Sequence, residues 1–249
     1  MKVSIITPSF NSSTFIRETV DSVICQTYKD WELIICDDGS DDGTIEILKK
    51  YVALDQRIKL IQNEVNFGPA VSRNNAIKHA SGDFIAFLDS DDVWMPEKLA
   101  MQISFMLKNN IAFSFSPYIR ITENGDYINT IYVPSKVNYD QLLKSCHIGC
   151  LTAVYSVKML GKVYMPNISK RQDFALWLKI LRMIPFAYSF PEVLAKYRVR
   201  KNSISNNKFK AAKYQWKVYR EVENLGFFRS VYYFCYYSFL GFTKTYFSK

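Results

Sequence analysis

The chain of 249 residues is 49% hydrophobic and 16% aromatic, so it can bury a sizeable core and is not globally disordered. Its formal net charge of +9 favours anionic partners, namely nucleic acid, phosphorylated ligands or an anionic membrane surface. The five cysteines are scattered and form no CxxC pair, which argues against a disulfide scaffold and against a zinc site. No apolar run reaches the roughly 18 residues that a membrane-spanning helix needs.

Strands and helices alternate through the first 106 residues. Strands are predicted at residues 3–7, 31–36, 58–62 and 83–88, of which the first and the last are expected to be buried. The helices that follow them are expected to begin near Ser12 or Ser13, Asp41 or Asp42, Pro69 and Pro96. This alternation predicts a parallel, doubly wound, Rossmann-like α/β sheet with right-handed crossovers. Polar residues end all these strands, and the carboxyl ends of parallel strands share one crevice, so a single site is expected there.

Beyond residue 107 the alternation weakens. Strands are expected at residues 112–121, 127–133, 186–190 and 193–199, and helices at 174–183 and 208–223. Asp173 directly precedes the helix at 174–183 and is expected at its N-cap. The chain shows no internal repeat and no low-complexity linker, so we expect one structural unit with a trailing C-terminal helical appendage.

Three carboxylates crowd the end of the strand at 83–88. Asp89, Asp91 and Asp92 follow its apolar run within four positions. Crowded carboxylates repel one another and resist burial unless a cation joins them. Oxygen ligands on a short loop suit Mg²⁺ or Mn²⁺, which would also bridge to a substrate diphosphate. The alternative is an acidic turn that only caps the next helix.

Six sequence segments carry a family resemblance. In order they are SIITPSFN, QTYKDWELIICDDGSDDGT, NFGPAVSRNNAI, GDFIAFLDSDDVWMPEKL, RQDFALWL and YRVRKNSIS. Together they resemble a family 2 glycosyltransferase of the GT-A fold, an inverting enzyme of the kind that builds bacterial surface polysaccharides. The resemblance extends over residues 3–205. It implies a catalytic domain at 1–205, with a nucleotide-sugar half at about 1–107 and an acceptor half at about 108–205, followed by a basic, aromatic helical region at 206–249.

The resemblance implies how a UDP-sugar donor is held. Asp38, or alternatively Asp37, would accept a hydrogen bond from the uracil ring, and Pro8 and Phe10 would line the base pocket. Arg73 would reach the nucleotide, whereas a lone arginine on a helix is otherwise read as a surface charge.

Asp89 and Asp91 match the family's DXD motif. By this match Asp91 would bind Mn²⁺ or Mg²⁺, and Asp89 would contact the ribose, or the metal through water. The metal would stabilise the charge that builds on the departing UDP. Arg200 stands where family members often carry a histidine that can bind the metal. Arg198, Arg200 or Lys201 would instead neutralise the diphosphate, the alternative being a solvated basic loop.

Asp173 matches the position of the family's catalytic base, which would take the proton from the acceptor hydroxyl. The family's usual Glu-Asp pair is here Gln172-Asp173, a departure from the pattern. The structural alternative for Asp173 is a plain helix N-cap.

The C-terminal region is aromatic and basic, which suits an anionic membrane surface; the alternative is a helix packed on the catalytic domain or on a second subunit. We therefore expect a cytoplasmic enzyme, peripherally associated with the inner face of the cell membrane. It would move a sugar from a UDP-sugar to a hydroxyl of a lipid-linked oligosaccharide, for O-antigen, capsule or similar polysaccharide, and would not bind nucleic acid. The alternatives are a nucleotidyltransferase-like enzyme and a basic nucleic-acid- or membrane-binding module without transferase activity.

Overall fold

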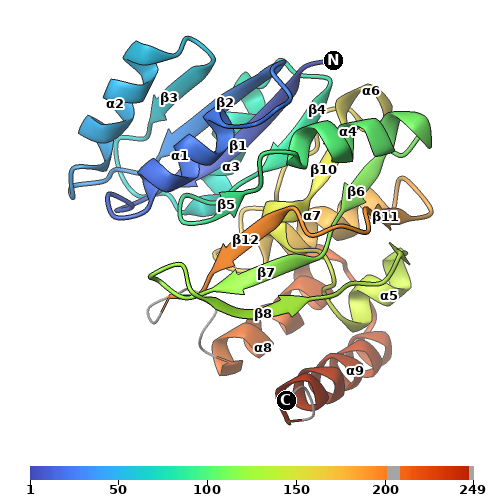
Figure 1. Cartoon of the computed structure of the whole chain (residues 1–249). Helices are drawn as coiled ribbons and strands as arrows, with labels where there is room; N and C mark the ends of the chain where they lie inside the picture. The colour runs from blue at the N-terminus through green and yellow to red at the C-terminus, as the bar shows by residue number, and fades with distance from the viewer. Residues whose placement is uncertain (201–207, 247–249) are drawn as a thin grey trace.

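A mostly parallel β-sheet forms the centre of the computed structural model, which describes residues 1–200 and 208–246, and the side chains of these outside 208–210 and 241–246 (Figure 1). Neighbouring strands are parallel from β3 to β4, whereas β10 and β9 run antiparallel to their neighbours. In spatial order the strands are β3 (Ile58–Gln62), β2 (Trp31–Asp37), β1 (Val3–Ser9), β4 (Phe84–Phe87), β10 (Val154–Ser156), β6 (Phe113–Phe115), β11 (Ala187–Ser189) and β9 (Lys136–Val137).

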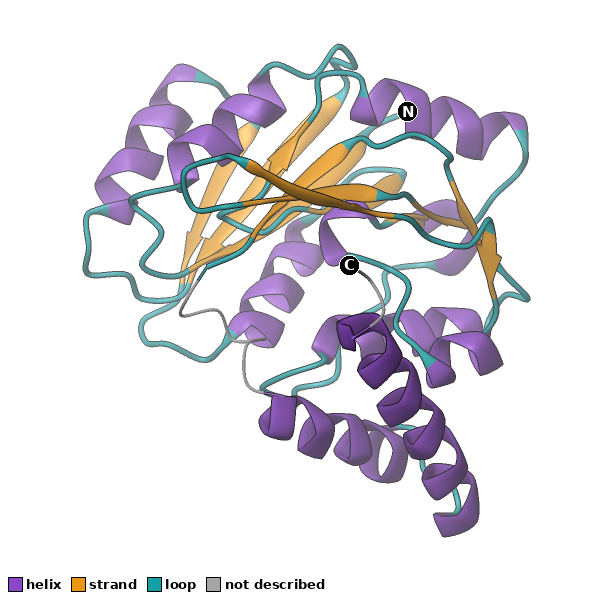
Figure 2. Ribbon diagram, turned by 60° about the horizontal axis from the view of Figure 1, so that its bottom comes forward, coloured by secondary structure: helices purple, strands orange, loops and turns teal. Residues whose placement is uncertain are grey.

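Helices cover both faces of this sheet, which explains why every residue of β1 and β2 is buried (Figure 2). Adjacent residues of a strand point to opposite faces, so Ile5 and Ile6 of β1 belong to two different core clusters. The cluster around Ile5 is shared with α1 (Ile16–Ile24), α2 (Thr44–Leu54) and α4 (Lys98–Lys108). The cluster around Ile6 is shared with α3 (Pro69–His79), α5 (Tyr139–Lys144), α6 (Val157–Leu160) and α7 (Gln172–Leu181).

A second, smaller sheet holds the acidic loop (residues 89–92) in place. Its order is β5 (Val93–Trp94), β12 (Ala195–Arg198), β7 (Tyr118–Ile121) and β8 (Tyr127–Ile131). Strand β5 follows the acidic loop directly and pairs antiparallel with β12, which comes about a hundred residues later in the chain. The loop is therefore clamped between the end of β4 and this second sheet.

The C-terminal helices pack against the core rather than trailing from it. They are α8 (Lys208–Lys217), a π-helical turn at Val218–Val222 and α9 (Phe227–Tyr246). Tyr219 is fully buried in the same cluster as α5 and α7, and its hydroxyl donates to the carbonyl of Leu143. The boundary expected at residues 205 and 206 lies outside the described residues. Across the described ranges, no helix combines the length and the hydropathy of a bilayer span.

The mostly parallel, doubly wound sheet predicted from the alternation is confirmed, and β3 has the predicted bounds. The single strand expected at 112–121 is wrong. It is two strands, β6 and β7, which lie in different sheets and are separated at Ser116 and Pro117. Proline lacks the N–H that a ladder needs, so the chain leaves one sheet there and enters the other. A helical turn at Cys150–Thr152 (3₁₀) and the short strands β5, β9 and β10 carry no clear sequence signal.

Candidate active site

A cleft of about 670 Å³ opens where β1, β2 and β4 end. Its lining brings together the candidate residues that the sequence pointed to, from both halves of the chain: Pro8, Phe10, Asp38, Arg73, Asp89, Asp91, Asp173, Arg198 and Arg200. Lys201 lies outside the described residues. The crevice predicted from the order of the strands is therefore present, and the residues beyond 107 close it from the opposite side.

The Asp38 carboxylate organises the loop at one end of the cleft. It is buried and accepts three hydrogen bonds, from Asn63 Nδ2 (2.7 Å) and from the backbone N–H groups of Phe67 (3.1 Å) and Gly68 (2.7 Å). Asp37 is turned to its own loop, where Ser40 donates from its N–H (2.8 Å) and its hydroxyl (2.7 Å). A carboxylate can accept about four hydrogen bonds. Asp38 thus keeps capacity for one more donor, and it lines the cleft where Asp37 does not.

Phe10 offers an apolar surface next to Asp38. Pro8 is buried in β1, whereas the Phe10 side chain is 47% exposed at the cleft. The following turn is tied to the acidic loop, because the hydroxyls of Ser12 and Ser90 lie 2.7 Å apart and share a hydrogen bond. A flat aromatic face on a fixed turn is suited to a planar ring.

Arg73 is a buried cation with spare donors. Its side chain is 6% exposed, and one terminal nitrogen donates to Asp89 Oδ1. Burial opposes its charge, but the negative groups around it, of which Asp89 contributes most, together raise the pKa of Arg73. Its Nε and Nη1 are buried and have no hydrogen-bond partner within the described part of the chain. Unmet buried donors are costly, so this position favours a ligand that supplies acceptor oxygens.

The acidic loop divides its three carboxylates between two tasks. Burial raises the pKa of Asp91 above its ordinary value; Arg200, whose Nε lies 2.8 Å from Asp91 Oδ2, opposes that shift and Asp89 adds to it. Asp92 is fully buried, and its Oδ1 accepts the N–H of Arg198 (2.9 Å). Burial, with Asp91 and Asp89 close by, raises the pKa of Asp92 well above its usual range. Asp92 therefore fixes the loop to β12, and Asp89 and Asp91 face the cleft.

The donor set fits a divalent ion shared with a ligand. Arg73 pairs with Asp89 Oδ1, and Arg200 pairs with Asp91 Oδ2. Each carboxylate therefore has a second oxygen outside its ion pair. Within the described residues no three histidine, cysteine or acidic side chains converge on one point that would hold a metal by themselves. Mg²⁺ commonly needs only one or two carboxylates when phosphates and water complete its shell. The site therefore suits Mg²⁺ or Mn²⁺ when it is held jointly with a diphosphate.

Arg198 is a crosslink between three elements. Its guanidinium donates to the carbonyls of Asp91 (2.9 Å) and Glu123 (2.8 Å) and forms an ion pair with Glu18 on α1. The side chain is 1% exposed, while that of Glu18 is 55% exposed. Although Arg198 lines the cleft, its donors are directed at the protein.

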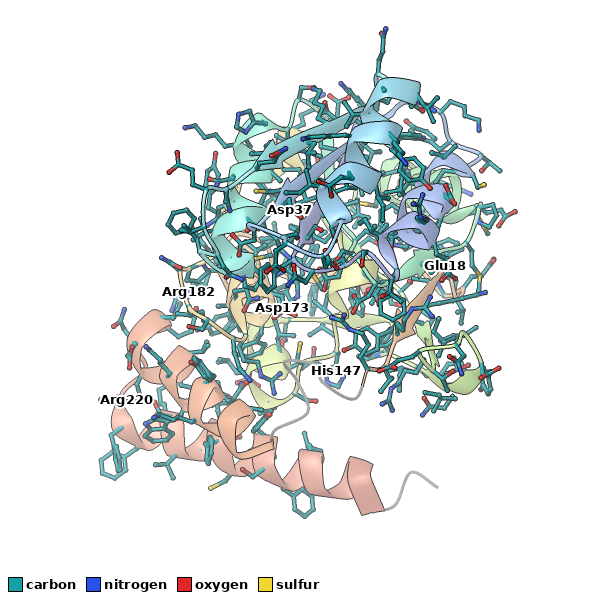
Figure 3. All side chains as sticks on the ribbon, turned by 90° about the vertical axis from the view of Figure 1, so that its left-hand side faces the viewer. Glu18, Asp37, His147, Asp173, Arg182 and Arg220 are labelled. Atoms are coloured by element: carbon teal, nitrogen blue, oxygen red, sulfur yellow. The ribbon has the colours of Figure 1, made fainter. Side chains whose placement is uncertain are left out.

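Asp173 lies in the first turn of α7, not at its N-cap. The helix begins at Gln172, and Arg171 occupies the N-cap with a φ of 64° and makes no capping side-chain bond. The plain N-cap expected at Asp173 is therefore wrong. The half-buried carboxylate lines the cleft, and it lies near enough to Arg73 to help raise the pKa of that arginine. Figure 3 shows it between the central sheet and the C-terminal helices.

Sequence reasoning missed the basic residues beside Asp173. Lys170 and Arg171 also line the cleft. Arg171 donates to the hydroxyl of Tyr237 on α9, and the ring centre of Tyr237 lies 5.3 Å from the guanidinium carbon of Arg171. Ala211 of α8 completes this wall. The basic pair was visible in the sequence, but its link to α9 depends on a tertiary contact.

A mostly parallel sheet with a cleft at its strand ends, lined by an arginine-flanked acidic loop and by the carboxylate of Asp173, is typical of a glycosyltransferase of the GT-A fold. The model for Glycosyl transferase family 2 matches residues 4–163, and the chain belongs to that family. The resemblance seen in the sequence is thus confirmed. The chain is assigned to this family and not to the alternatives, a nucleotidyltransferase-like enzyme or a nucleic-acid-binding module.

Two curated relatives are similar over most of their length. The chain is 46% identical over 237 residues to the putative teichuronic acid biosynthesis glycosyltransferase TuaG of Bacillus subtilis (strain 168), which covers 95% of this chain and 94% of the relative. It is 47% identical over 224 residues to the UDP-Glc:alpha-D-GlcNAc-diphosphoundecaprenol beta-1,3-glucosyltransferase WfgD of Escherichia coli, covering 89% of this chain and 87% of the relative.

A solved structure shows the same fold. The match to S. aureus TarS 1-349 in complex with UDP-GlcNAc has a TM-score of 0.75 at 21% identity, and it covers 99% of this chain and 73% of that one. At this level of identity the likeness concerns the fold alone.

Proposed function

We propose that this protein is an inverting glycosyltransferase that moves a sugar from a UDP-sugar to a hydroxyl of a lipid-linked oligosaccharide, in the assembly of a bacterial surface polysaccharide. The observation that carries the proposal is the cleft itself, whose lining combines the arginine-paired carboxylates of Asp89 and Asp91 with the carboxylate of Asp173. The relative WfgD is named for a UDP-glucose donor and a diphosphoundecaprenol-linked acceptor, which supports both substrate classes.

The donor would lie along the N-terminal wall of the cleft. Asp38 would accept the uracil N–H with its remaining lone pair, and Phe10 would cover one face of the base, beside Pro8. Arg73 would donate from its two unmatched nitrogens, Nε and Nη1, to oxygens of the ribose or the diphosphate. Arg200, rather than Arg198, would neutralise the diphosphate, because Arg198 already donates to Glu18, Asp91 and Glu123.

Asp91 and Asp89 would hold Mg²⁺ or Mn²⁺ together with the donor diphosphate. When bound, the ion supplies Lewis-acid stabilisation of the negative charge on the leaving UDP. Arg200 pairs with Asp91 Oδ2, so this arginine and the ion would share the negative charge of that carboxylate.

Asp173 would act as the general base. Its carboxylate would take the proton from the acceptor hydroxyl while that oxygen forms a bond to the anomeric carbon, and the bond from the anomeric carbon to the UDP oxygen would break on the opposite face. This single displacement inverts the anomeric configuration. Asp173 lies in the first turn of α7 and not at its N-cap, so its carboxylate does not serve as the cap of that helix.

We place the enzyme in the cytoplasm at the inner face of the cell membrane. A lipid-linked acceptor presents its sugar only within reach of a bilayer, and the basic, aromatic C-terminal helices are suited to a peripheral contact.

The test is UDP release from a panel of UDP-, GDP- and dTDP-sugars with Mn²⁺ or EDTA. We expect slow, metal-dependent release from one UDP-sugar, lowered about 100-fold or more in Asp91→Ala. Asp173→Ala should retain donor binding by calorimetry and lose transfer to the acceptor by about 100-fold or more. Asp41→Ala, an exposed carboxylate outside the cleft, serves as the matched control. A protein that neither turns over nor binds any of these donors would refute the assignment.

A further inference from the structure

Helix α9 packs on the protein with only one face. Ser230 and Tyr233 are buried on that face, and Tyr237 accepts the hydrogen bond from Arg171 there. These positions are separated by three or four residues, so they form one stripe along the helix. The contacts of this stripe are with α5, α8 and the π-helical turn.

The opposite side of α9 is a surface of exposed aromatic residues. Phe228 is 86% exposed, Tyr232 48% and Phe239 64%, and Cys235 between them is exposed as well. Their spacing of four, three and four residues places them on one stripe, the outer face of α9. Large aromatic side chains gathered in this way indicate a surface that is covered in the working protein.

The charge beside the outer face is positive on balance, which favours an anionic partner. Helix α9 contains no acidic residue, and Arg229 is exposed beside the stripe. Lys144 of α5 lies 5.8 and 5.3 Å from the ring centres of Tyr232 and Tyr236, and it is paired with Asp140 of the same helix at 2.6 Å. Aromatic rings that alternate with cations match the interface of a bilayer, where headgroup phosphates lie above the acyl chains. A second copy of this chain would bring the same positive charge against itself.

The outer face has a fixed relation to the cleft. Arg171 lines the cleft beside Asp173 and is held by Tyr237 from the inner stripe of α9, and Ala211 of the neighbouring α8 lines the cleft as well. Figures 1 and 3 show α8 and α9 together at the lower edge of the molecule. In a lipid-linked oligosaccharide the reacting hydroxyl is separated from the bilayer only by the acceptor sugars and the linking phosphates, so the cleft must lie within a few sugar lengths of the membrane surface.

We propose that the outer face of α9 lies in the interface of an anionic bilayer and sets the acceptor side of the cleft against the membrane. The orientation of the cleft rests on the proposed function, whereas the docking surface itself rests on the exposed aromatic residues and the surrounding charge. The helix lies along the surface and does not cross the bilayer.

The experiment is co-sedimentation of the full chain with vesicles of phosphatidylcholine that contain phosphatidylglycerol, and with vesicles of phosphatidylcholine alone. The double variant Phe228→Ser/Phe239→Ser removes two exposed side chains that make no core contacts. Leu54→Ser/Tyr132→Ser is the matched control, because these side chains are 84% and 82% exposed on other elements. We expect the first pair to weaken partitioning into the anionic vesicles about tenfold or more, and the control pair to leave it unchanged. Partitioning into neutral vesicles should be weaker.

A second measurement locates the contact. Phe228→Trp should lose fluorescence in vesicles made with brominated lipid to a greater extent than the unsubstituted chain does. Equal partitioning of both serine pairs, or no partitioning of the unsubstituted chain, would overturn the proposal. A dimer detected by light scattering would also overturn it, if the Phe228→Ser/Phe239→Ser variant alone failed to form that dimer and the unsubstituted chain did not bind vesicles.

Donor turnover separates this proposal from the proposed function. UDP release from a water-soluble donor should be the same in both serine pairs, because neither pair touches the cleft. If the chain partitions as expected but releases no UDP, the docking surface stands and the transferase assignment fails. If the chain releases UDP but both serine pairs partition alike, the transferase assignment stands and the docking surface fails.

Discussion

Arg198 should stabilise the fold chiefly through backbone carbonyls and not through its ion pair. In Arg198→Met, the partly buried carbonyls of Asp91 and Glu123 lose donors at 2.9 and 2.8 Å. A buried polar group left without a partner costs about 1–3 kcal/mol, so we expect a loss of about 2–4 kcal/mol in the free energy of unfolding. Glu18 is 55% exposed, and Glu18→Gln should cost less than about 1 kcal/mol because water replaces its partner.

Urea unfolding followed by tryptophan fluorescence measures both effects, and the midpoint with the m-value gives each free energy. The double variant Arg198→Met/Glu18→Gln closes a mutant cycle, in which the coupling energy should stay below about 1 kcal/mol. If Glu18→Gln reproduced most of the loss seen in Arg198→Met, the ion pair would be the main contribution and the reasoning would be wrong.

Three further changes test other parts of the molecule. Burial opposes the ionisation of Glu32, but hydrogen bonds from Lys59 and Ser4 lower its pKa from 4.5 to about 2. The stabilisation by ionised Glu32 is therefore complete above pH 4.5 and is lost as the pH falls toward 2. In an acid titration of the free energy of unfolding, Glu32→Gln should show a weaker dependence on pH in that window. Gly82→Ala would place a Cβ 2.7 Å from the carbonyl oxygen of Lys2, so thermal unfolding should show a clear loss of stability, whereas Gly226→Ala, with no atom within 4 Å, should not. Arg73→Lys keeps the charge but removes the unmatched N–H groups; calorimetry should show UDP binding with metal weakened about tenfold, and unchanged affinity would argue against a ligand at those donors.

Local pattern was enough to predict the nucleotide half of the fold. The segment at 58–62 has the bounds of β3, because its isoleucine and leucine residues favour a strand and polar residues flank it on both sides. The order of these strands along the chain also placed Asp38 and Asp89 at one crevice, since parallel strands finish on the same edge. These predictions depend on neighbours in sequence and on sheet geometry alone.

Long-range contacts explain what sequence could not supply. Whether Arg198 or Arg200 faces a ligand depends on Glu18, which is 180 positions away. The left-handed backbone of Arg171, which displaces Asp173 from the N-cap, is unusual for an arginine and has no local signature. The sequence leaves open whether the aromatic C-terminal region faces a membrane or packs on the protein, and only the packing separates Tyr233, which is buried, from Tyr232, which is exposed.

The pairing of β5 with β12 has a consequence for how the protein is made. Residues 93–94 leave the ribosome about a hundred residues before their partners at 195–196. At roughly 5–20 residues per second, the nascent chain spends about 5–20 s with its acidic loop lacking the strand that closes it. The edge of β5 is open during that interval, so a translational pause or a premature stop before residue 195 leaves the acidic loop without the strand that closes it. A working site can therefore form only after β12 has been made and has paired with β5.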